Sequence, residues 1–258
     1  MINFKNYING KKAFVPFITA GDPSLDKTEE FLHELINAGA SIIEVGIPFS
    51  DPIAEGNVIM EADIRALSAG TRVDKIFDMI RHFRQSEKDF PLVFMTYLNP
   101  VFNFGYEKFF KLCEELKIVG IIIPDLPYEE KEEVKKVASK YNVAVISLIA
   151  PTSKERIKMI ASDAEGFLYL VSSLGVTGMR DNIKTDVSSI AAEIKKYTDI
   201  PVCVGFGIKN AESAKKMTEV ADGAIVGSAI VNIIAKNGAN SNKYIYDFCK
   251  EIVDEINK

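Results

Sequence analysis

The sequence has no tryptophan, only two histidines and only three cysteines among its 258 residues. Cys113, Cys203 and Cys249 are widely spaced and odd in number, and none belongs to a CxxC pair. This pattern excludes a disulfide-stabilised scaffold and indicates buried free thiols in a reduced, cytoplasmic chain. His33 and His82 lie in separate stretches with helical periodicity, far from other metal-type ligands, so no zinc site is expected.

Long hydrophobic runs and an excess of positive charge are also missing. No apolar segment approaches the roughly 20 residues that span a bilayer, and the N-terminus has no apolar signal-peptide core. The formal net charge of −5 argues against nucleic-acid binding, which needs a basic footprint. We therefore expect a chain that binds neither membrane nor nucleic acid, with room for a local pocket that takes a small anion.

Short apolar runs alternate with amphipathic stretches along the chain. The predicted strands cover residues 14–19, 42–47, 92–97, 119–123, 143–149, 166–171, 201–204 and 223–226. The predicted helices cover residues 25–38, 58–69, 74–84, 106–116, 129–141, 153–161, 185–197, 211–220, 229–236 and 243–256. Ser24 and Gly39 are the expected cap and stop of the first of these helices.

Eight strand–helix periods in a chain of this length predict a (β/α)₈ TIM barrel, since such barrels have about 250 residues. The strands are continuous apolar runs, as is typical of parallel strands covered on both faces. No linker or composition shift divides the chain, so residues 1–258 are expected to form one domain. A doubly wound open sheet is the alternative, but it would more often carry a glycine-rich turn directly after the first strand.

A carboxylate, Glu44, interrupts an otherwise apolar strand near its end. Catalytic groups of a barrel sit at the C-terminal ends of the strands and in the loops that follow. Because side chains alternate along a strand, Glu44 points into the barrel if Ile43 packs against the helices. From spacing alone, a salt bridge to a loop explains Glu44 equally well. Asp51 and Glu55 follow in the next loop, where a carboxylate is usually just solvated. Further candidates near strand ends are Tyr97, Asn99, Asp125, Tyr169 and Thr177.

Glycines cluster after the last three predicted strands, at positions 175, 178, 205, 207 and 227. Glycine lets backbone N–H groups approach an anion closely, and a helix N-terminus adds a favourable dipole. The loops after strands seven and eight are the usual phosphate site of barrel enzymes. Each glycine pair alone also fits an ordinary turn, but two adjacent sites favour a phosphorylated substrate. No lysine stands out in the strands, which argues against a Schiff-base aldolase.

Five segments, in order along the chain, resemble the signature of the tryptophan synthase alpha chain family. They are residues 14–23 (FVPFITAGDP), 44–52 (EVGIPFSDP), 124–127 (PDLP), 175–178 (GVTG) and 205–208 (GFGI). The resemblance implies a TIM-barrel lyase that cleaves indole-3-glycerol phosphate into indole and glyceraldehyde 3-phosphate. It also implies a beta-chain partner in an α₂β₂ complex, with pyridoxal phosphate on the beta chain and no cofactor on this chain.

Carried over by position, the resemblance implies catalytic roles for Glu44 and Glu55. In the implied retro-aldol reaction, Glu44 protonates indole C3 and Glu55 accepts the indole N–H. The implied substrate-binding residues are Phe17, Ile59, Tyr97, Tyr169 and Thr177, and the implied phosphate-binding residues are Gly178, Gly207, Gly227 and Ser228. The resemblance further implies that residues 48–55 and the loop around Thr177 face the beta chain. Residues 50–60 and 175–183 are expected to be loops that gate the site.

Two departures from the family pattern lie in one stretch. Glu55 stands where the family usually has aspartate, and the extra methylene adds about 1.5 Å of reach; displacement of that order can lower a rate about 10²-fold. Asn57 and Met60 replace a usual proline and glutamine. Three alternatives therefore stay open: a stand-alone indole-glycerol-phosphate lyase, a weakly active subunit that mainly regulates a beta chain, and a different phosphate-binding barrel such as a sugar-phosphate isomerase.

Overall fold

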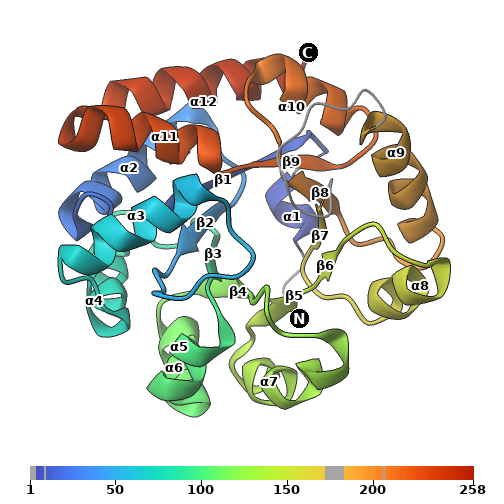
Figure 1. Ribbon diagram of the computed structural model, residues 1–258, viewed down its shortest axis with the longest axis horizontal. Coiled ribbons are helices and arrows are strands. Elements are labelled where there is room, and N and C mark those ends of the chain that lie inside the picture. The colour runs from blue at the N-terminus through green and yellow to red at the C-terminus, as the bar shows by residue number, and fades with distance from the viewer. Residues whose placement is uncertain (1–3, 9, 172–182, 206) are drawn as a thin grey trace.

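A ring of parallel strands surrounded by helices makes up the fold in a computed structural model that describes residues 4–8, 10–171, 183–205 and 207–258 (Figure 1). The strand order is β5-β4-β3-β2-β1-β9-β8-β7-β6. The strands are β1 (Ala13–Thr19), β2 (Ile43–Gly46), β3 (Leu92–Met95), β4 (Ile118–Ile122), β5 (Ala144–Ile146), β6 (Leu148–Ile149), β7 (Leu168–Val171), β8 (Val202–Gly205) and β9 (Gly223–Val226).

Helices follow the strands and cover the outside of the ring (Figure 1). They are α1 (Lys5–Ile8), α2 (Leu25–Ala38), α3 (Asn57–Ser68), α4 (Val73–Phe83), α5 (Leu98–Phe104), α6 (Tyr106–Glu115), α7 (Lys131–Ala138), α8 (Lys154–Ser162), α9 (Ile183–Ile194), α10 (Ala211–Thr218), α11 (Ser228–Asn237) and α12 (Asn242–Ile256). Short 3-10 turns η1 (Tyr128–Glu130), η2 (Ser139–Tyr141) and η3 (Gly238–Asn240) complete the set. The predicted TIM barrel is confirmed.

The ring closes at a single residue, Ser147, which separates β5 from β6. β5 pairs with β4 through Gly120 and Ala144, whereas β6 pairs with β7 through Leu148 and Tyr169. The backbone N–H of Tyr169 donates to the carbonyl of Ser147 over 3.1 Å. The prediction of one unbroken strand over residues 143–149 is therefore wrong, because the chain changes pairing partner in its middle.

A buried lysine of α7 supports this closure. The Lys131 ammonium donates to Ser147 Oγ over 2.9 Å and lies 3.4 Å from Asp163 Oδ2. Lys135 pairs with Asp163 Oδ1 at 2.6 Å and with Glu165 at 3.5 Å. Burial lowers the pKa of Lys131, and the Asp163 charge opposes that shift. We call this junction between β5 and β6 the closure seam. The buried Lys131 charge has partners on both sides of it, as a buried ammonium requires.

Alternating side chains divide the strands between two cores. Val15 and Phe17 of β1 point into the barrel, whereas Phe14 and Ile18 point outward to the helix layer. The barrel interior is filled by Ala13, Ile42, Val93, Met95, Ile122, Ile146, Phe167, Tyr169, Cys203 and Ile225, among others. This alternation decides which face of β2 carries Glu44.

Helix α1 covers the N-terminal end of the barrel. Phe4, just before it, is 1% exposed and its ring lies 5.8 Å from that of Phe167. Neither α1 nor α5 was predicted from the sequence, because four and seven residues respectively are too few to show a helical period.

Asn57 to Met60 form the first turn of α3, so the predicted loop over residues 50–60 is shorter than expected.

The helix caps predicted from the sequence are present in the structure. The Ser24 side chain accepts from the Lys27 backbone N–H over 3.3 Å, and Gly39 ends α2 at φ 102°, so both predicted caps are confirmed.

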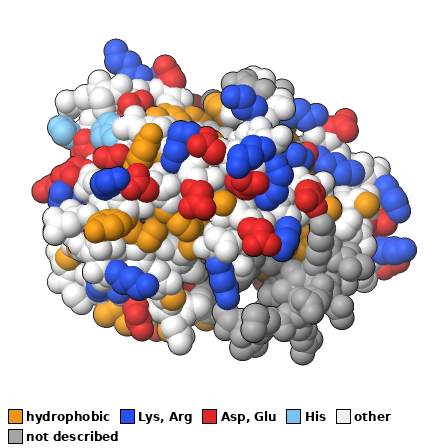
Figure 2. Space-filling view, turned by 90° about the horizontal axis from the view of Figure 1, so that it is seen from above, with side chains coloured by type: hydrophobic (Ala, Val, Ile, Leu, Met, Phe, Trp, Pro, Cys, Tyr) orange, Lys and Arg blue, Asp and Glu red, His pale blue; other side chains and the backbone are white. Residues whose placement is uncertain are grey.

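The three cysteines are free and buried, as expected. Of the described residues, no helix is both long and apolar enough to cross a membrane. Figure 2 shows Lys and Arg side chains interspersed with Asp and Glu over the face seen from above.

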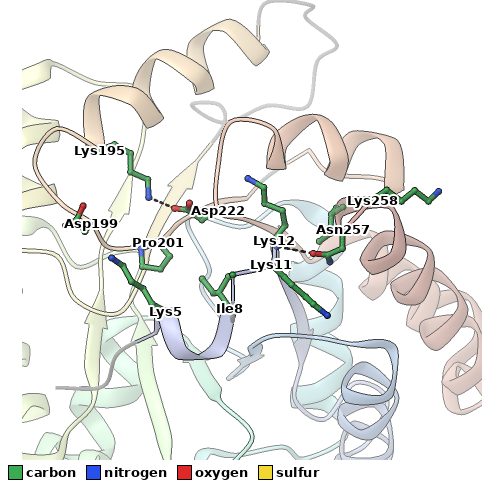
Figure 3. A pocket seen from close by; sticks show the side chains of 12 residues that line it. Lys5, Ile8, Lys11, Lys12, Lys195, Asp199, Pro201, Asp222, Asn257 and Lys258 are labelled. Atoms are coloured by element: carbon green, nitrogen blue, oxygen red, sulfur yellow. Dashed lines mark hydrogen bonds and ion pairs between the residues drawn. The ribbon is translucent and has the colours of Figure 1, made fainter.

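A cavity of about 680 Å³ opens at the N-terminal ends of the strands (Figure 3). Its lining includes Lys12, just before β1, and Lys195 and Asp222, which form an ion pair. Lys12 Nζ donates to the carbonyl of Ala221 over 2.9 Å. Because barrel enzymes act at the opposite, C-terminal end of the strands, this cavity is not the candidate active site.

The closure seam predicts a specific cost for loss of the buried lysine. Lys131→Met keeps most of the side-chain volume but removes the charge and the bond to Ser147, so we expect a loss of about 2 kcal/mol in the free energy of unfolding. Urea unfolding measures it. Lys136→Met, on the exposed side of the same helix, is the control and should change stability by less than about 0.5 kcal/mol. Equal effects of the two substitutions would contradict the seam's role.

Candidate active site

Glu44 lies inside the barrel near its C-terminal end, which we call the barrel mouth. In the strand register Glu44 is level with Phe17 of β1 and Val93 of β3, both inward-facing. Its neighbours Ile43 and Val45 face the helix layer, as the alternation predicts. Glu44 is 1% exposed, and no ion pair to it forms within the described residues.

The surroundings of Glu44 favour its neutral form. Burial raises the pKa of Glu44 well above its ordinary value. Burial also raises the pKa of Tyr169 and of Cys203, and a negative charge on Glu44 would raise both further. With no ion pair to it among the described residues, Glu44 is shifted towards its protonated form. A carboxylic acid in this state is suited to act as a general acid.

Glycines at the strand ends make room for the two aromatic rings of the barrel mouth. A Cβ on Gly46 would lie 2.5 Å from Phe17 Cζ, and one on Gly205 would lie 2.3 Å from the Tyr169 hydroxyl. A Cβ on Gly227 would also lie within 3.3 Å of Phe17. Only glycine fits at Gly46 and Gly205 without moving these rings. The result is an apolar, aromatic surround for a buried carboxyl group.

Glu55 lies in the loop between β2 and α3 and contacts a second carboxyl group, that of Asp63 in α3. Burial raises the pKa of Glu55, while a hydrogen bond from Asp63 lowers it. Burial, the Glu55 charge and the same hydrogen bond together raise the pKa of Asp63 to about 8. Sequence reasoning missed Asp63, which is 5% exposed within a polar-looking helical stretch.

Three buried side-chain atoms have no hydrogen-bond partner within the described part of the chain: Thr19 Oγ1, Glu44 Oε1 and Glu55 Oε2. Buried polar atoms are nearly always paired, so each exception calls for an explanation. All three belong to the C-terminal end of β1, to β2, or to the loop after β2. Polar atoms of a substrate could satisfy them. Thr19 was also missed, although it shares the inward face of β1 with Phe17.

The remaining predicted pocket residues surround this loop. The Tyr97 hydroxyl accepts from the Ala54 backbone N–H over 2.9 Å, and its ring lies 5.4 Å from that of Phe49. Burial raises the pKa of Tyr97 to about 12, so it stays neutral. Ile59 of α3 is half-buried and packs against the barrel interior. Tyr97 therefore fixes the loop that carries Glu55.

The predicted phosphate-binding residues lie at the ends of β8 and β9. Gly207 has φ +78° and open space where a side chain would be. Gly227 caps α11, and Ser228 is its exposed first residue, so the free N–H groups of this helix start at the barrel mouth. Thr177 and Gly178 lie outside the described residues.

Other sequence candidates stay apart from the site. The Asp125 carboxylate accepts from the Leu98 backbone N–H over 2.9 Å and so anchors the start of α5. Asn99 is exposed and bonds to Asn103, and Asp51 is exposed as well. Across the residues that the structure describes, no three His, Cys, Asp or Glu side chains are grouped to hold a metal ion.

Comparison with known proteins identifies the family. Residues 4–257 match the family model described as tryptophan synthase alpha chain. The chain belongs to the tryptophan synthase alpha chain family. A tryptophan synthase alpha chain of Lacticaseibacillus casei is 47% identical over 249 residues, which are 96% of this chain and 92% of that protein.

Solved structures of tryptophan synthase alpha chains are similar to this chain as well. The tryptophan synthase alpha subunit of Legionella pneumophila is 35% identical to this chain, with a TM-score of 0.90 and 99% of each chain covered. A structure described as the tryptophan synthase α₂β₂ complex of Pyrococcus furiosus gives 35% identity and a TM-score of 0.87, with 95% of this chain and 99% of that chain covered.

Membership of the tryptophan synthase alpha chain family confirms the resemblance found in the sequence and makes this chain a lyase of tryptophan biosynthesis. The family reaction is cleavage of indole-3-glycerol phosphate. A sugar-phosphate isomerase is thereby excluded as the alternative barrel enzyme.

Burial of the Glu44 carboxyl without a partner should lower the free energy of unfolding. Glu44→Met removes an unpartnered polar group, so we expect the protein to gain about 1–3 kcal/mol at pH 7. The folded-state pKa of Glu44 lies above its unfolded value, so the unfolded chain releases this proton first as pH rises. The gain should therefore be small near pH 4 and grow towards pH 8. Urea unfolding at several pH values measures it, with Glu61→Met, at an exposed position of α3, as the control. A loss of stability at pH 7 would contradict this account.

Proposed function

We propose that this chain cleaves indole-3-glycerol phosphate with Glu44 as the general acid and Glu55 as the partner carboxylate. The observation that carries the assignment is the Glu44 carboxyl, buried at the barrel mouth with one oxygen unpartnered. Burial favours its protonated form, and its position lets it face a substrate that enters at the strand ends. The family reaction needs such a group because indole is a poor leaving carbanion.

The proposed reaction begins with transfer of the Glu44 proton to C3 of the indole ring. The ring nitrogen then carries a positive charge and becomes the electron sink. The bond between C3 and the glycerol carbon breaks, its electron pair returns to the ring, and the hydroxyl on that carbon becomes the aldehyde of glyceraldehyde 3-phosphate. The Glu44 carboxylate takes the hydroxyl proton, so its protonation state is restored and atoms balance.

Glu55 has the complementary role in this proposal. As a carboxylate it accepts the indole N–H and stabilises the positive ring formed when C3 is protonated. The two glutamates can play opposite parts because their surroundings differ. Burial raises the pKa of both, but at Glu55 a hydrogen bond from Asp63 opposes the rise, whereas nothing opposes it at Glu44. The aromatic rings of Phe17 and Tyr169, with Ile59, would hold the indole between the two carboxyl groups.

The phosphate group is assigned to Gly207, Gly227 and Ser228. Open space at Gly207 and the N-terminus of α11 support an anion held by backbone N–H groups. Binding energy from this remote group orients the reacting carbon at the other side of the mouth. Thr177 and Gly178 are proposed to complete the same end of the site.

A beta chain is the proposed partner, in an α₂β₂ complex in the cytoplasm. Apolar side chains stand exposed in the loop after β2, in α3 and in α5: Ile53 is 79% exposed, Ile64 62% and Phe102 64%. Large exposed apolar side chains near one site support a protein interface. The proposed chemistry is carried by side chains of this chain alone, and pyridoxal phosphate belongs to the beta chain.

Indole release from indole-3-glycerol phosphate tests the assignment. Glu44→Gln should lower kcat by about 10³-fold, the range for loss of a general acid, with KM within about threefold because binding is left intact. Glu61→Gln is the matched control and should retain turnover. Unchanged turnover in Glu44→Gln would refute the role of Glu44.

The same assay with and without a beta chain separates the forms that the function could take. We expect detectable turnover by the isolated chain and higher turnover in the complex. Full turnover without a partner and no response to it would instead indicate a stand-alone lyase. Absence of cleavage in both conditions, with activation of the beta chain retained, would indicate a regulatory subunit.

A further inference from the structure

Asp63 occupies an unusual position for a charged residue. It lies in α3 and is 5% exposed, while the next residue, Ile64, is 62% exposed. The helix thus buries its aspartate and exposes its isoleucine, the reverse of the usual arrangement. A carboxyl group kept inside at the expense of an apolar side chain calls for a partner.

The partners of Asp63 are two points on the loop between β2 and α3. The Phe49 backbone N–H, at the start of this loop, lies close enough to the Asp63 carboxyl to lower its pKa, and the Glu55 carboxyl, at the end of the loop, is hydrogen-bonded to it. Tyr97 holds the same loop from β3 through the Ala54 N–H. Asp63 is therefore the point in α3 to which the segment carrying Glu55 is fixed.

A hydrogen bond between two carboxyl groups requires one proton between them. Burial raises the pKa of both carboxyl groups. The Glu55 charge and the shared hydrogen bond raise that of Asp63 further, to about 8, whereas the same hydrogen bond opposes the rise at Glu55. At neutral pH the proton therefore belongs to Asp63, which donates, and Glu55 is the acceptor carboxylate.

The other charged and titratable groups near Asp63 leave this assignment in place. Asp22, from the loop after β1, adds negative charge that favours a proton on Asp63. Asp22 itself accepts from Arg65 Nε and Nη2, at 2.8 and 2.7 Å, so the Arg65 charge is compensated. Tyr97 stays neutral to about pH 12. Asp63 is thus the group facing Glu55 that changes charge near pH 8.

We propose that protonated Asp63 is a positioning residue, which donates to Glu55 and so holds the Glu55 carboxylate at the barrel mouth to receive the indole N–H. The proposal rests on the function proposed above. It also explains how this chain uses glutamate where its family usually has aspartate, because the longer side chain has a donor to fix it. Loss of the Asp63 proton would place two negative charges together and release Glu55.

The pH dependence of kcat/KM for indole-3-glycerol phosphate cleavage tests this role. In the unsubstituted chain kcat/KM should fall about tenfold per pH unit above pH 8 as Asp63 ionises. Asp63→Asn can still donate to Glu55 but does not titrate. It should stay within about threefold of the parent at pH 7 and lack this fall. A purely structural Asp63 would leave the pH profile unchanged, and that result would overturn the proposal.

Asp63→Leu separates the donor from the volume of the side chain. It keeps the bulk but removes the donor, so kcat/KM at pH 7 should fall at least tenfold. Asp51→Asn, in the same loop but exposed, is the matched control and should follow the parent at every pH. Activity of Asp63→Leu equal to that of Asp63→Asn would also overturn the proposal.

A second readout does not depend on turnover. With ¹³C-labelled aspartate carboxyl groups, NMR should show one resonance that titrates near pH 8 and is lost in Asp63→Asn. Its absence would overturn the proton assignment. This titration without any cleavage would refute the proposed function alone, whereas cleavage with an unchanged pH profile in Asp63→Asn would refute only the role of Asp63.

Discussion

Burial of the Glu44 carboxyl at the end of an apolar strand is the constraint on which the barrel mouth depends. The group is surrounded by Phe17, Tyr169 and other interior side chains, and these rings fit only because Gly46 and Gly205 lack side chains. An unpartnered carboxyl in such a place costs stability. The closed ring of strands, with Phe4 packed on Phe167 at its N-terminal end, supplies the rigid core that tolerates this cost.

The electrostatics of the mouth follow from where protons are held. Glu44 and Asp63 both have raised pKa values, the first through burial alone and the second through burial and the neighbouring Glu55. Neither has a cation beside it in the described structure, because Arg65 is committed to Asp22. Burial thus favours a proton on Glu44 and on Asp63, and the hydrogen bond from Asp63 favours the carboxylate form of Glu55. That distribution matches a reaction that donates a proton at one side of an indole ring and accepts an N–H at the other.

Sequence alone predicted the parts of this account that depend on periodicity and strand-end position. The eight strand–helix periods gave the barrel, and alternation in β2 gave the inward direction of Glu44. The break at Ser147 was missed because it depends on which neighbours the strand pairs with, and residue types do not record that. Thr19 and Asp63 were missed for a related reason: a threonine ending a strand and an aspartate in a helix are ordinary in sequence, and only packing makes them buried. The roles of the site residues rest on the family resemblance and remain proposals.

The protonation state of Glu44 in the free protein is the most direct test of this account. With ¹³C-labelled glutamate carboxyl groups, NMR at pH 7 should show one resonance at the position of a protonated carboxylic acid, and that resonance should disappear in Glu44→Gln. Its titration should lie well above the ordinary range for glutamate, as burial without a partner requires. A Glu44 resonance that is fully ionised at pH 7 and titrates near its ordinary pKa would contradict the account.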